Sequence, residues 1–204
     1  PAIIESAKIK LNNDVISNRN EKFYESIRGK KIGYIFQNPM TALNPVLTIG
    51  EQIIEAIEAN TNLRGKMVKQ YALELLEKAS VSFAEERLDK YPHQLSGGLC
   101  QRIVFAIAIA AKPDLIIADE PTTALDVTIQ KSVLHTLTSL CQQENTAIIL
   151  ITHDMGVVSE ICNYVYVLRN GKQVEEGPTS KVLLKPQTKY SKELMCSVPR
   201  IDKR

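Results

Sequence analysis

The sequence contains no tryptophan, and only 5% of its 204 residues are aromatic. This scarcity argues against a surface that stacks nucleic-acid bases, because such surfaces need exposed aromatic rings. Neither sign of charge is in excess, since 25 lysines and arginines stand against 23 aspartates and glutamates. A basic stripe that binds nucleic acid or an anionic membrane is not indicated, and we expect no nucleic-acid partner.

Long apolar runs are also missing. The longest uncharged apolar run covers the nine residues 103–111, whereas a helix that spans a membrane needs about 20. The first residues, Pro1 to Glu5, lack both the basic start and the apolar stretch of a signal peptide. We therefore expect no membrane-spanning segment in this sequence.

Cysteine is scarce, and none of the four cysteines, at 100, 141, 162 and 196, belongs to a C-x-x-C pair. This spacing argues against a zinc site and against a disulfide framework. Unpaired thiols with mostly apolar neighbours are typical of a reducing compartment. The remaining composition, 44% hydrophobic and 24% charged, is that of a globular chain with about one domain.

Three short apolar runs predict strands of one sheet, at residues 32–36, 115–118 and 147–151. The last two flank a helical pattern at 127–143, and a strand–helix–strand order indicates parallel pairing. Polar residues interrupt neither of these two runs. We therefore expect an α/β fold with a parallel sheet covered on both faces.

Two consecutive helices are predicted over residues 48–59 and 67–79, without a strand between them. Thr48 and Glu51 have the spacing of a capping box at the start of a helix over 48–59. Apolar residues recur with a helical period across 67–79. A small helical lobe is therefore expected next to the sheet.

The two ends of the chain carry weaker patterns. Residues 1–31 are polar, with one short strand expected at 8–11. Near the other end, a strand at 165–168 leads through Asn170-Gly171 into residues 173 and 174. The Asn-Gly pair is typical of a type I′ hairpin turn, and two short helices are expected after it.

Two adjacent acids, Asp119 and Glu120, follow the strand at 115–118. Ligands of open α/β sheets bind at the carboxyl ends of strands. Because successive strand residues point in opposite directions, the two acids can serve different tasks. Asp119 is a candidate Mg²⁺ ligand, and Glu120 is a candidate base for an attacking water. Taken alone, the pair is better explained as solvated acids at a strand end.

Ser96, Gly97 and Gly98 stand just before the apolar helical run. Ser96 can cap that helix, glycines let the backbone approach an anion, and a helix N-terminus offers free N–H groups. This pattern predicts a phosphate site. For Ser-Gly-Gly alone, a plain capped helix after a glycine turn is the better interpretation.

His153 and Gln37 each follow a predicted strand. His153 lies 33 residues after Glu120, so the two strand ends can meet at one edge of the sheet. At that edge His153 can touch a γ-phosphate and a water, and Gln37 can give an oxygen to Mg²⁺ or water. In isolation, a loop histidine and a loop cap are the simpler interpretations.

The order of these motifs changes the interpretation. They are Gln37, then Leu95-Ser96-Gly97-Gly98-x-x-Gln101-Arg102, then Asp119-Glu120-Pro121-Thr122-Thr123-Ala124-Leu125-Asp126, then Thr152-His153-Asp154. From about residue 30 onward, the chain resembles the nucleotide-binding subunit of an ABC transporter. The resemblance implies a partial P-loop NTPase fold, with a parallel-sheet core and an inserted α-helical signature subdomain.

This resemblance also implies a domain organisation. Residues 1–47 and 113–177 correspond to a partial RecA-like ATPase core with Q-loop, Walker B, D-loop and H-loop. Residues 48–112 correspond to the helical signature subdomain. Residues 178–204 correspond to a C-terminal helical tail.

The same resemblance assigns roles to the motif residues. It makes Glu120 the catalytic glutamate and His153 the switch histidine of an ATPase. Asp119 matches the Walker B aspartate, and it shares Mg²⁺ with Gln37 of the Q-loop. The residues that the resemblance assigns to nucleotide binding are Gln37, Ser96, Gly97, Gly98, Gln101, Asp119 and the D-loop residue Asp126. The signature residues close on ATP held by the other subunit of a dimer.

ATP and Mg²⁺ are the implied cofactors. The implied partners are membrane-spanning permease subunits, a second ATP-binding subunit in a homo- or heterodimer, and indirectly a solute-binding protein. The implied location is cytoplasmic, peripheral on the inner face of the cell membrane. Residues 36–45, 91–98, 124–130 and 197–200 narrow the resemblance to importers of oligopeptides, dipeptides or nickel.

One motif of the family, G-x-x-x-x-G-K-[ST], does not occur in these 204 residues. In the family it precedes the Q-loop, and here 36 residues precede Gln37. We therefore expect an N-terminally truncated chain that by itself binds and hydrolyses ATP poorly. Within the signature, Cys100 stands where the family often has a basic residue, and we expect it to be a small buried group.

Two other functions stay open. A catalytically inactive remnant or docking module fits the missing motif, although Glu120, His153 and Ser96 are all present. A soluble ABC ATPase of repair or translation is the third possibility. The loop from Asn38 to Pro45 and the C-terminal tail favour a transporter subunit.

Overall fold

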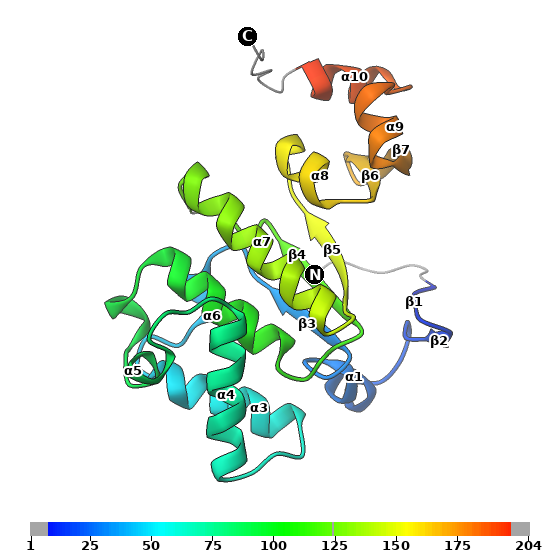
Figure 1. Ribbon diagram of the computed structural model, residues 1–204. Helices are drawn as coiled ribbons and strands as arrows, with labels where there is room; N and C mark the ends of the chain where they lie inside the picture. The colour runs from blue at the N-terminus through cyan, green and yellow to red at the C-terminus, as the bar shows by residue number, and fades with distance from the viewer. Residues whose placement is uncertain (1–7, 124, 197–204) are drawn as a thin grey trace.

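The structure is a computed structural model that describes residues 8–123 and 125–196 (Figure 1). Its elements, in chain order, are β1 (Lys10–Leu11), β2 (Asp14–Val15), α1 (Glu21–Ile27), β3 (Ile32–Ile35), α2 (Pro39–Ala42), α3 (Ile49–Asn60), α4 (Lys66–Lys78), α5 (Ala84–Leu88), the 3₁₀ turn η1 (Pro92–Gln94), α6 (Gly97–Ile109), β4 (Leu115–Asp119), α7 (Val127–Gln143), β5 (Ala147–Ile151), α8 (Met155–Ile161), β6 (Tyr164–Arg169), β7 (Lys172–Pro178), α9 (Thr179–Leu184) and α10 (Lys189–Cys196). The position Ala124 and the segment 197–200, which contribute to the narrower family resemblance, lie outside the described residues.

The three predicted strands form one parallel sheet in the order β3-β4-β5. Helix α7 connects β4 to β5, so the predicted strand–helix–strand unit is confirmed. The register pairs Ile35 with Ala118 and Asp119 with Ile151. Because the strands run in the same direction and end together, the residues that follow them meet at one edge of the sheet.

The two faces of this sheet differ in burial. On one face α6 and α7 pack against the strands, and Ile35, Ile116 and Ala118 are completely buried. On the other face, Ile149 and Ile151 remain 50% and 47% exposed. The prediction of a sheet covered on both faces is therefore wrong for the described residues. An apolar run does not reveal on which side the helices pack, and here α6 and α7 share one side.

The helices α3 to α6, which we call the helical segment, include the three predicted helices α3, α4 and α6. The capping box of α3 is present, since Thr48 Oγ1 accepts from Glu51 N at 3.2 Å and Glu51 accepts from Thr48 N at 2.7 Å. One hydrophobic cluster includes Leu75 and Phe105 of this segment together with Ile116 of the sheet. The helical segment and the sheet therefore share a core.

Polar contacts also join the helical segment to α7. Glu144, which follows α7, accepts from Lys78 Nζ at 2.6 Å and from Lys112 Nζ at 2.8 Å, and its side chain is only 7% exposed. Burial opposes ionisation of Glu144, but the two lysines more than offset it and lower its pKa. Arg102 of α6 adds hydrogen bonds to two hydroxyls of α7 at 2.7 and 2.8 Å.

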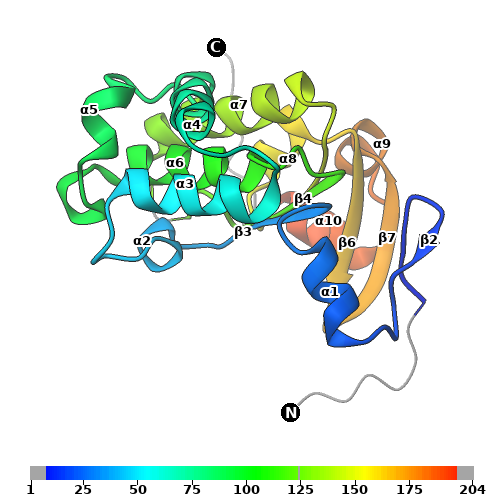
Figure 2. The same ribbon diagram turned by 90° about the horizontal axis from the view of Figure 1, so that it is seen from below.

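Figure 2 shows the helical segment at one end of the molecule and the β6–β7 hairpin at the other. The hairpin turn is of the predicted type, because Asn170 and Gly171 both have positive φ, 50° and 72°. Helices α9 and α10 confirm the two short helices expected after it. Glu175 of β7 anchors α10 by accepting hydrogen bonds from the backbone amides of Gln187 and Thr188 at 2.8 and 3.1 Å.

Several short helices were not predicted from the sequence, namely α1, α2, α5 and α8. Each has seven residues or fewer, too short to show a helical period. Cys100 is buried as expected, and all four cysteines are unpaired. None of the helices in the described ranges is long and apolar enough to cross a membrane.

Candidate functional site

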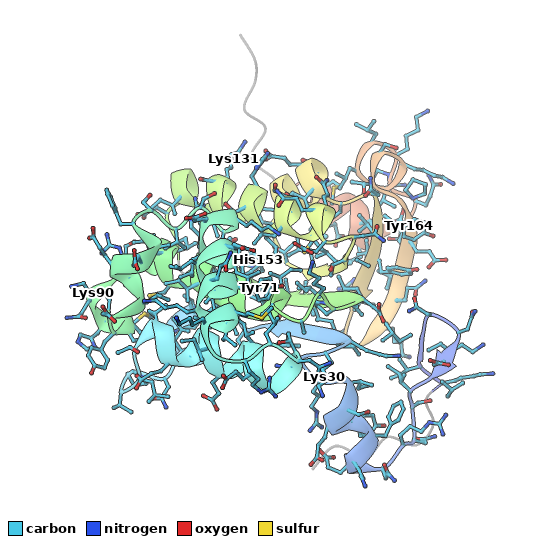
Figure 3. All side chains as sticks on the ribbon, turned by 60° about the horizontal axis from the view of Figure 1, so that its bottom comes forward. Lys30, Tyr71, Lys90, Lys131, His153 and Tyr164 are labelled. Atoms are coloured by element: carbon cyan, nitrogen blue, oxygen red, sulfur yellow. The ribbon has the colours of Figure 1, made fainter. Side chains whose placement is uncertain are left out.

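The candidate site lies at the carboxyl edge of the β3-β4-β5 sheet. Gln37 follows β3, Glu120 follows β4 and His153 follows β5. Figure 3 labels His153, which in that view lies between Lys90 in the helical segment and Tyr164 on the β6–β7 hairpin. The parallel register therefore gathers three residues that are far apart in the sequence.

Glu120 is the centre of this cluster. Its Oε2 accepts from Gln37 Nε2 at 2.8 Å and from Thr123 Oγ1 at 2.9 Å, and its Oε1 lies 2.8 Å from His153 Nδ1. The backbone leaves the strand sharply here, with a left-handed φ of 43° at Glu120, while Glu120 N still donates to the carbonyl of Ile151. The sequence-based expectation that the two strand ends meet is confirmed.

These contacts set the charge of Glu120. The hydrogen bond with His153, followed by that from Thr123, lowers the pKa of Glu120, while burial acts in the opposite sense. Glu120 is thus an ionised hydrogen-bond acceptor at neutral pH. The His153 side chain is 73% exposed, and its other ring nitrogen, Nε2, has no protein partner among the described residues. That nitrogen is available to a ligand.

Asp119 lies beside this cluster on the open face of the sheet. Its Oδ2 accepts a hydrogen bond from the Tyr34 hydroxyl at 3.0 Å. This bond, together with desolvation and the negative charge of Asp119, raises the pKa of Tyr34. Tyr34 is not among the residues predicted from the sequence. The signal that could have identified it is its place on the same face as Asp119, at an alternating position of the neighbouring strand.

The donor atoms around Asp119 suit Mg²⁺. Mg²⁺ prefers oxygen ligands and usually keeps several waters. Gln37 uses its amide nitrogen on Glu120, which leaves its amide oxygen as a second oxygen donor besides the Asp119 carboxylate. In the described ranges no group of three or more histidine, cysteine or acidic side chains could hold a metal ion. Water or phosphate oxygens would therefore complete a Mg²⁺ site here.

The Ser-Gly-Gly segment begins α6 as predicted. Ser96 caps the helix, accepting from Leu99 N at 3.4 Å, and both Ser96 and Gly97 are exposed. Gly98 is buried instead, and a Cβ atom there would lie 3.0 Å from Ile129 Cγ2 on α7. Gly98 therefore permits close packing of α6 on α7, whereas Ser96 and Gly97 present their atoms to the surface.

Two further predicted residues lie outside the Glu120 cluster. Asp126 precedes α7 and is exposed. Gln101 is completely buried, and neither polar atom of its amide has a hydrogen-bond partner in the part of the chain that the structure describes. The structure thus does not bring Gln101 to the surface on which Ser96 and Gly97 lie.

Comparisons with known proteins agree with this arrangement. A family model described as ABC transporter matches residues 4–123, more than half of the chain. The chain is 48% identical over 199 residues to the oligopeptide transport ATP-binding protein AppD of Bacillus subtilis (strain 168), covering 98% of this chain and 61% of that protein. It is 41% identical over 199 residues to the dipeptide transport ATP-binding protein DppD of Escherichia coli (strain K12), with the same coverage of 98% and 61%. The chain therefore spans 61% of the length of each of these relatives.

Solved structures show the same fold. An ATP-binding cassette, solved as a dimer in a post-hydrolysis state with ADP and phosphate, matches with a TM-score of 0.75 and 28% identity, over 86% of this chain and 74% of that one. The cbiO1 protein of Clostridium perfringens, part of an ABC transporter complex, matches with a TM-score of 0.75 and 24% identity, over 89% of this chain and 69% of that one. The fold is therefore the α/β fold of ABC ATPase cassettes, and the chain belongs to the ABC transporter family.

Proposed function

We propose that this chain is an ATP-binding and ATP-hydrolysing subunit of an ABC importer for peptides. One observation carries the proposal: the Glu120 carboxylate is held between Gln37 and His153 at the carboxyl edge of the sheet, 2.8 Å from each. An ionised carboxylate with a neighbouring histidine and an amide can activate and orient a water molecule. The names of the similar proteins, which are oligopeptide and dipeptide transport proteins, support peptides as the solute.

In the proposed reaction Glu120 accepts a proton from a water molecule, whose oxygen attacks the γ-phosphorus of ATP. The bond between that phosphorus and the bridging oxygen of ADP breaks, which releases ADP and phosphate. Gln37 orients the water, and the free Nε2 of His153 contacts the γ-phosphate. Such reactions depend mainly on positioning and on electrostatic stabilisation.

Asp119 and Gln37 would hold Mg²⁺, which when bound neutralises charge on the phosphates. Their oxygen donors lie at the same sheet edge as Glu120, which is the support for this assignment. Ser96, Gly97 and Asp126 are exposed at the surface, as a role toward ATP on a second subunit requires. Gly98 and Gln101 would support that surface from within.

The wider assembly is part of the same proposal. We assign residues 48–112 to a helical signature subdomain, residues 1–47 and 113–177 to the ATPase core, and residues 178–204 to a tail. A second ATP-binding subunit and membrane-spanning permease subunits would be the direct partners, and a solute-binding protein an indirect one. Such a chain would work at the inner face of the cell membrane.

Nucleotide binding is the first test. The chain carries three histidines, so the ring signal of His153 can be followed by NMR, together with the methyl signal of Ile151. Because these 204 residues lack the G-x-x-x-x-G-K-[ST] motif, binding should be weak, and the titration extends to high Mg·ATP concentrations. We expect both signals to move in that titration and to stay in place with adenosine, because the site faces phosphates. If neither signal moves when Mg·ATP is added, the proposal that this site binds a nucleotide is contradicted.

Transport is the second test, made in cells that carry the whole importer. Exchanging Glu120→Gln removes the base, and we expect the uptake of a labelled tripeptide to fall by about 100-fold or more. Glu176→Gln is the matched control, because Glu176 is an exposed acid of β7. Undiminished uptake in E120Q would contradict the role of Glu120, and uptake of nickel in place of peptide would contradict the solute.

A further inference from the structure

The Tyr34 hydroxyl is the one side-chain donor that contacts Asp119 among the described residues. It lies 3.0 Å from Asp119 Oδ2. Neither an ion pair nor a second side-chain hydrogen bond of Asp119 occurs in the ranges 8–123 and 125–196. The second oxygen of Asp119, Oδ1, is therefore left without a protein partner there.

The strand register explains why the hydroxyl reaches this carboxylate. Tyr34 pairs with Ile117, and Asp119 stands two residues farther along β4, so both side chains are on the same face. The phenol ring extends toward the carboxyl edge of the sheet. Its centroid lies 4.7 Å from that of Phe36, which directly follows β3. The ring contact limits the positions that the hydroxyl can take.

A carboxylate that binds a metal is usually oriented by a hydrogen bond to its other oxygen. Such partners fix the side-chain rotamer, and their removal typically weakens metal binding by about 10- to 100-fold. The Tyr34 hydroxyl is neutral, so it can orient the carboxylate without cancelling the negative charge that attracts a cation. A lysine or arginine at this place would cancel that charge.

We propose that Tyr34 is a positioning residue for Mg²⁺: its hydroxyl holds Oδ2 of Asp119 and leaves Oδ1 for the metal. This inference rests on the proposed function, since it takes Asp119 as a ligand of Mg²⁺. It goes beyond that function, because it gives a strand residue outside the sequence motifs a part in the metal site. Tyr34 acts through Asp119 and does not itself touch the nucleotide.

The alternative is that Tyr34 merely packs against Phe36. Tyr34→Phe separates the two roles, because it keeps the ring and removes only the hydroxyl. Tyr34→Leu removes both. Tyr166→Phe is a matched control, because Tyr166 is an exposed tyrosine of β6 without a carboxylate partner in the described part of the chain.

The experiment uses Mn·ATP as a paramagnetic probe and the NMR signal of the Ile151 methyl group as the reporter. Ile151 pairs with Asp119 in the register, so a metal bound at Asp119 broadens its signal. We expect the Mn·ATP concentration for half-broadening to rise by about 10- to 100-fold in Y34F and Y34L, and to stay unchanged in Y166F. The binding of ATP in the presence of a chelator should be the same in Y34F and the wild type, which a general loss of structure would not allow.

Each outcome decides between the possibilities. A Y34F chain that responds to Mn·ATP as the wild type does would overturn the inference, whether or not Y34L is weakened. The variant Asp119→Asn tests the proposed function separately, because it should weaken the response to Mn·ATP whatever Tyr34 does. If D119N responds to Mn·ATP as the wild type does, or if Mn·ATP does not broaden the Ile151 signal of the wild type, the Mg²⁺ assignment fails, and the inference about Tyr34 falls with it.

Discussion

The two faces of the β3-β4-β5 sheet come from the same three strands and yet serve different purposes. The covered face carries Ile35, Ile116 and Ala118, which are completely buried under α6 and α7. The open face carries Tyr34, 42% exposed, and the Asp119 carboxylate that it contacts. Side chains alternate along a strand, so a single strand can supply the core with one set of residues and a site with the other.

The difference separates residues that stabilise the fold from residues that keep atoms free for a ligand. Ile35, Ile116 and Ala118 of the covered face are apolar and completely buried, so they cannot contact a ligand. On the open face and at its edge, Asp119 and His153 each keep an atom free of protein partners within the described residues. We therefore expect substitutions on the covered face to act on folding, and those on the open face to act on binding and turnover.

The largest effect should follow from shortening a covered side chain. Ile116→Ala removes a fully buried side chain from the cluster shared with α6 and α7, and should lower the free energy of unfolding by about 2–5 kcal/mol. Ile149→Ala makes the same change on the neighbouring strand of the open face, where the side chain is 50% exposed. Its cost should be about 0.5 kcal/mol.

Urea denaturation of the two variants measures this pair directly. Equal losses of stability would show that the open face is packed in solution, and would remove the basis of the comparison. A loss of stability confined to I116A would support the distinction between the covered face and the open face.

An intermediate effect is expected where polar contacts hold the covering helix in place. Glu144→Gln leaves Lys78 and Lys112 without their carboxylate, at a side chain that is 7% exposed. Losing hydrogen bonds to a charged group should cost about 1–3 kcal/mol of unfolding free energy. The exposed pair of Lys69 and Glu85, 3.8 Å apart, offers the control, because Glu85→Gln should cost under about 1 kcal/mol.

Thermal and urea unfolding of both variants provide the measurement. If E144Q and E85Q lost the same unfolding free energy, the ion pairs of Glu144 would stabilise the fold no more than an exposed pair does. Apolar packing alone would then hold α7 against the helical segment.

The smallest effect on stability should come from His153→Ala at the open edge. Its main consequence is electrostatic: the hydrogen bond with His153 is the largest cause of the lowered pKa of Glu120, so the substitution should raise that pKa toward its ordinary value. Since the folded pKa is lowered, ionised Glu120 stabilises the fold above the ordinary pKa, and this contribution is lost as pH falls through the folded pKa. In H153A this contribution should be smaller, and its loss should be complete at a higher pH than in the wild type.

The titration of the Glu120 carboxyl carbon by NMR measures this shift. His135→Ala is the control, because His135 is an exposed histidine of α7 away from the site. A Glu120 titration that is the same in H153A and the wild type would show that the two side chains do not interact in solution.

Much of the fold was predictable because its signals are local. The capping box of Thr48 and Glu51, the period of α4 and the Asn170-Gly171 turn each depend on residues a few positions apart. The short helices α1, α2, α5 and α8 escaped prediction, because their contacts with the rest of the chain, rather than a sequence period, stabilise them. The coverage of the sheet was predicted wrongly for the described residues, because an apolar run has the same appearance whichever face is packed.

The candidate site, like the fold, was predictable from the sequence only in part. The order of its motifs along the chain determined the family, and the strand ends indicated that Glu120 and His153 would meet. That Gln37 donates to Glu120 across 83 positions, and Tyr34 to Asp119 across 85, was decided by the tertiary structure alone. The burial of Gln101 and Gly98 against the helices, away from the exposed Ser96, was decided there too.

The sequence by itself therefore determined the family, the elements that form locally, and the parallel pairing of the strands. The tertiary structure decided which face of the sheet is covered and which atoms of the site remain free. The physical reason is that capping, periodicity and motif order involve neighbours in the chain, whereas coverage and hydrogen-bond partners depend on the register between distant strands and on the side from which the helices pack.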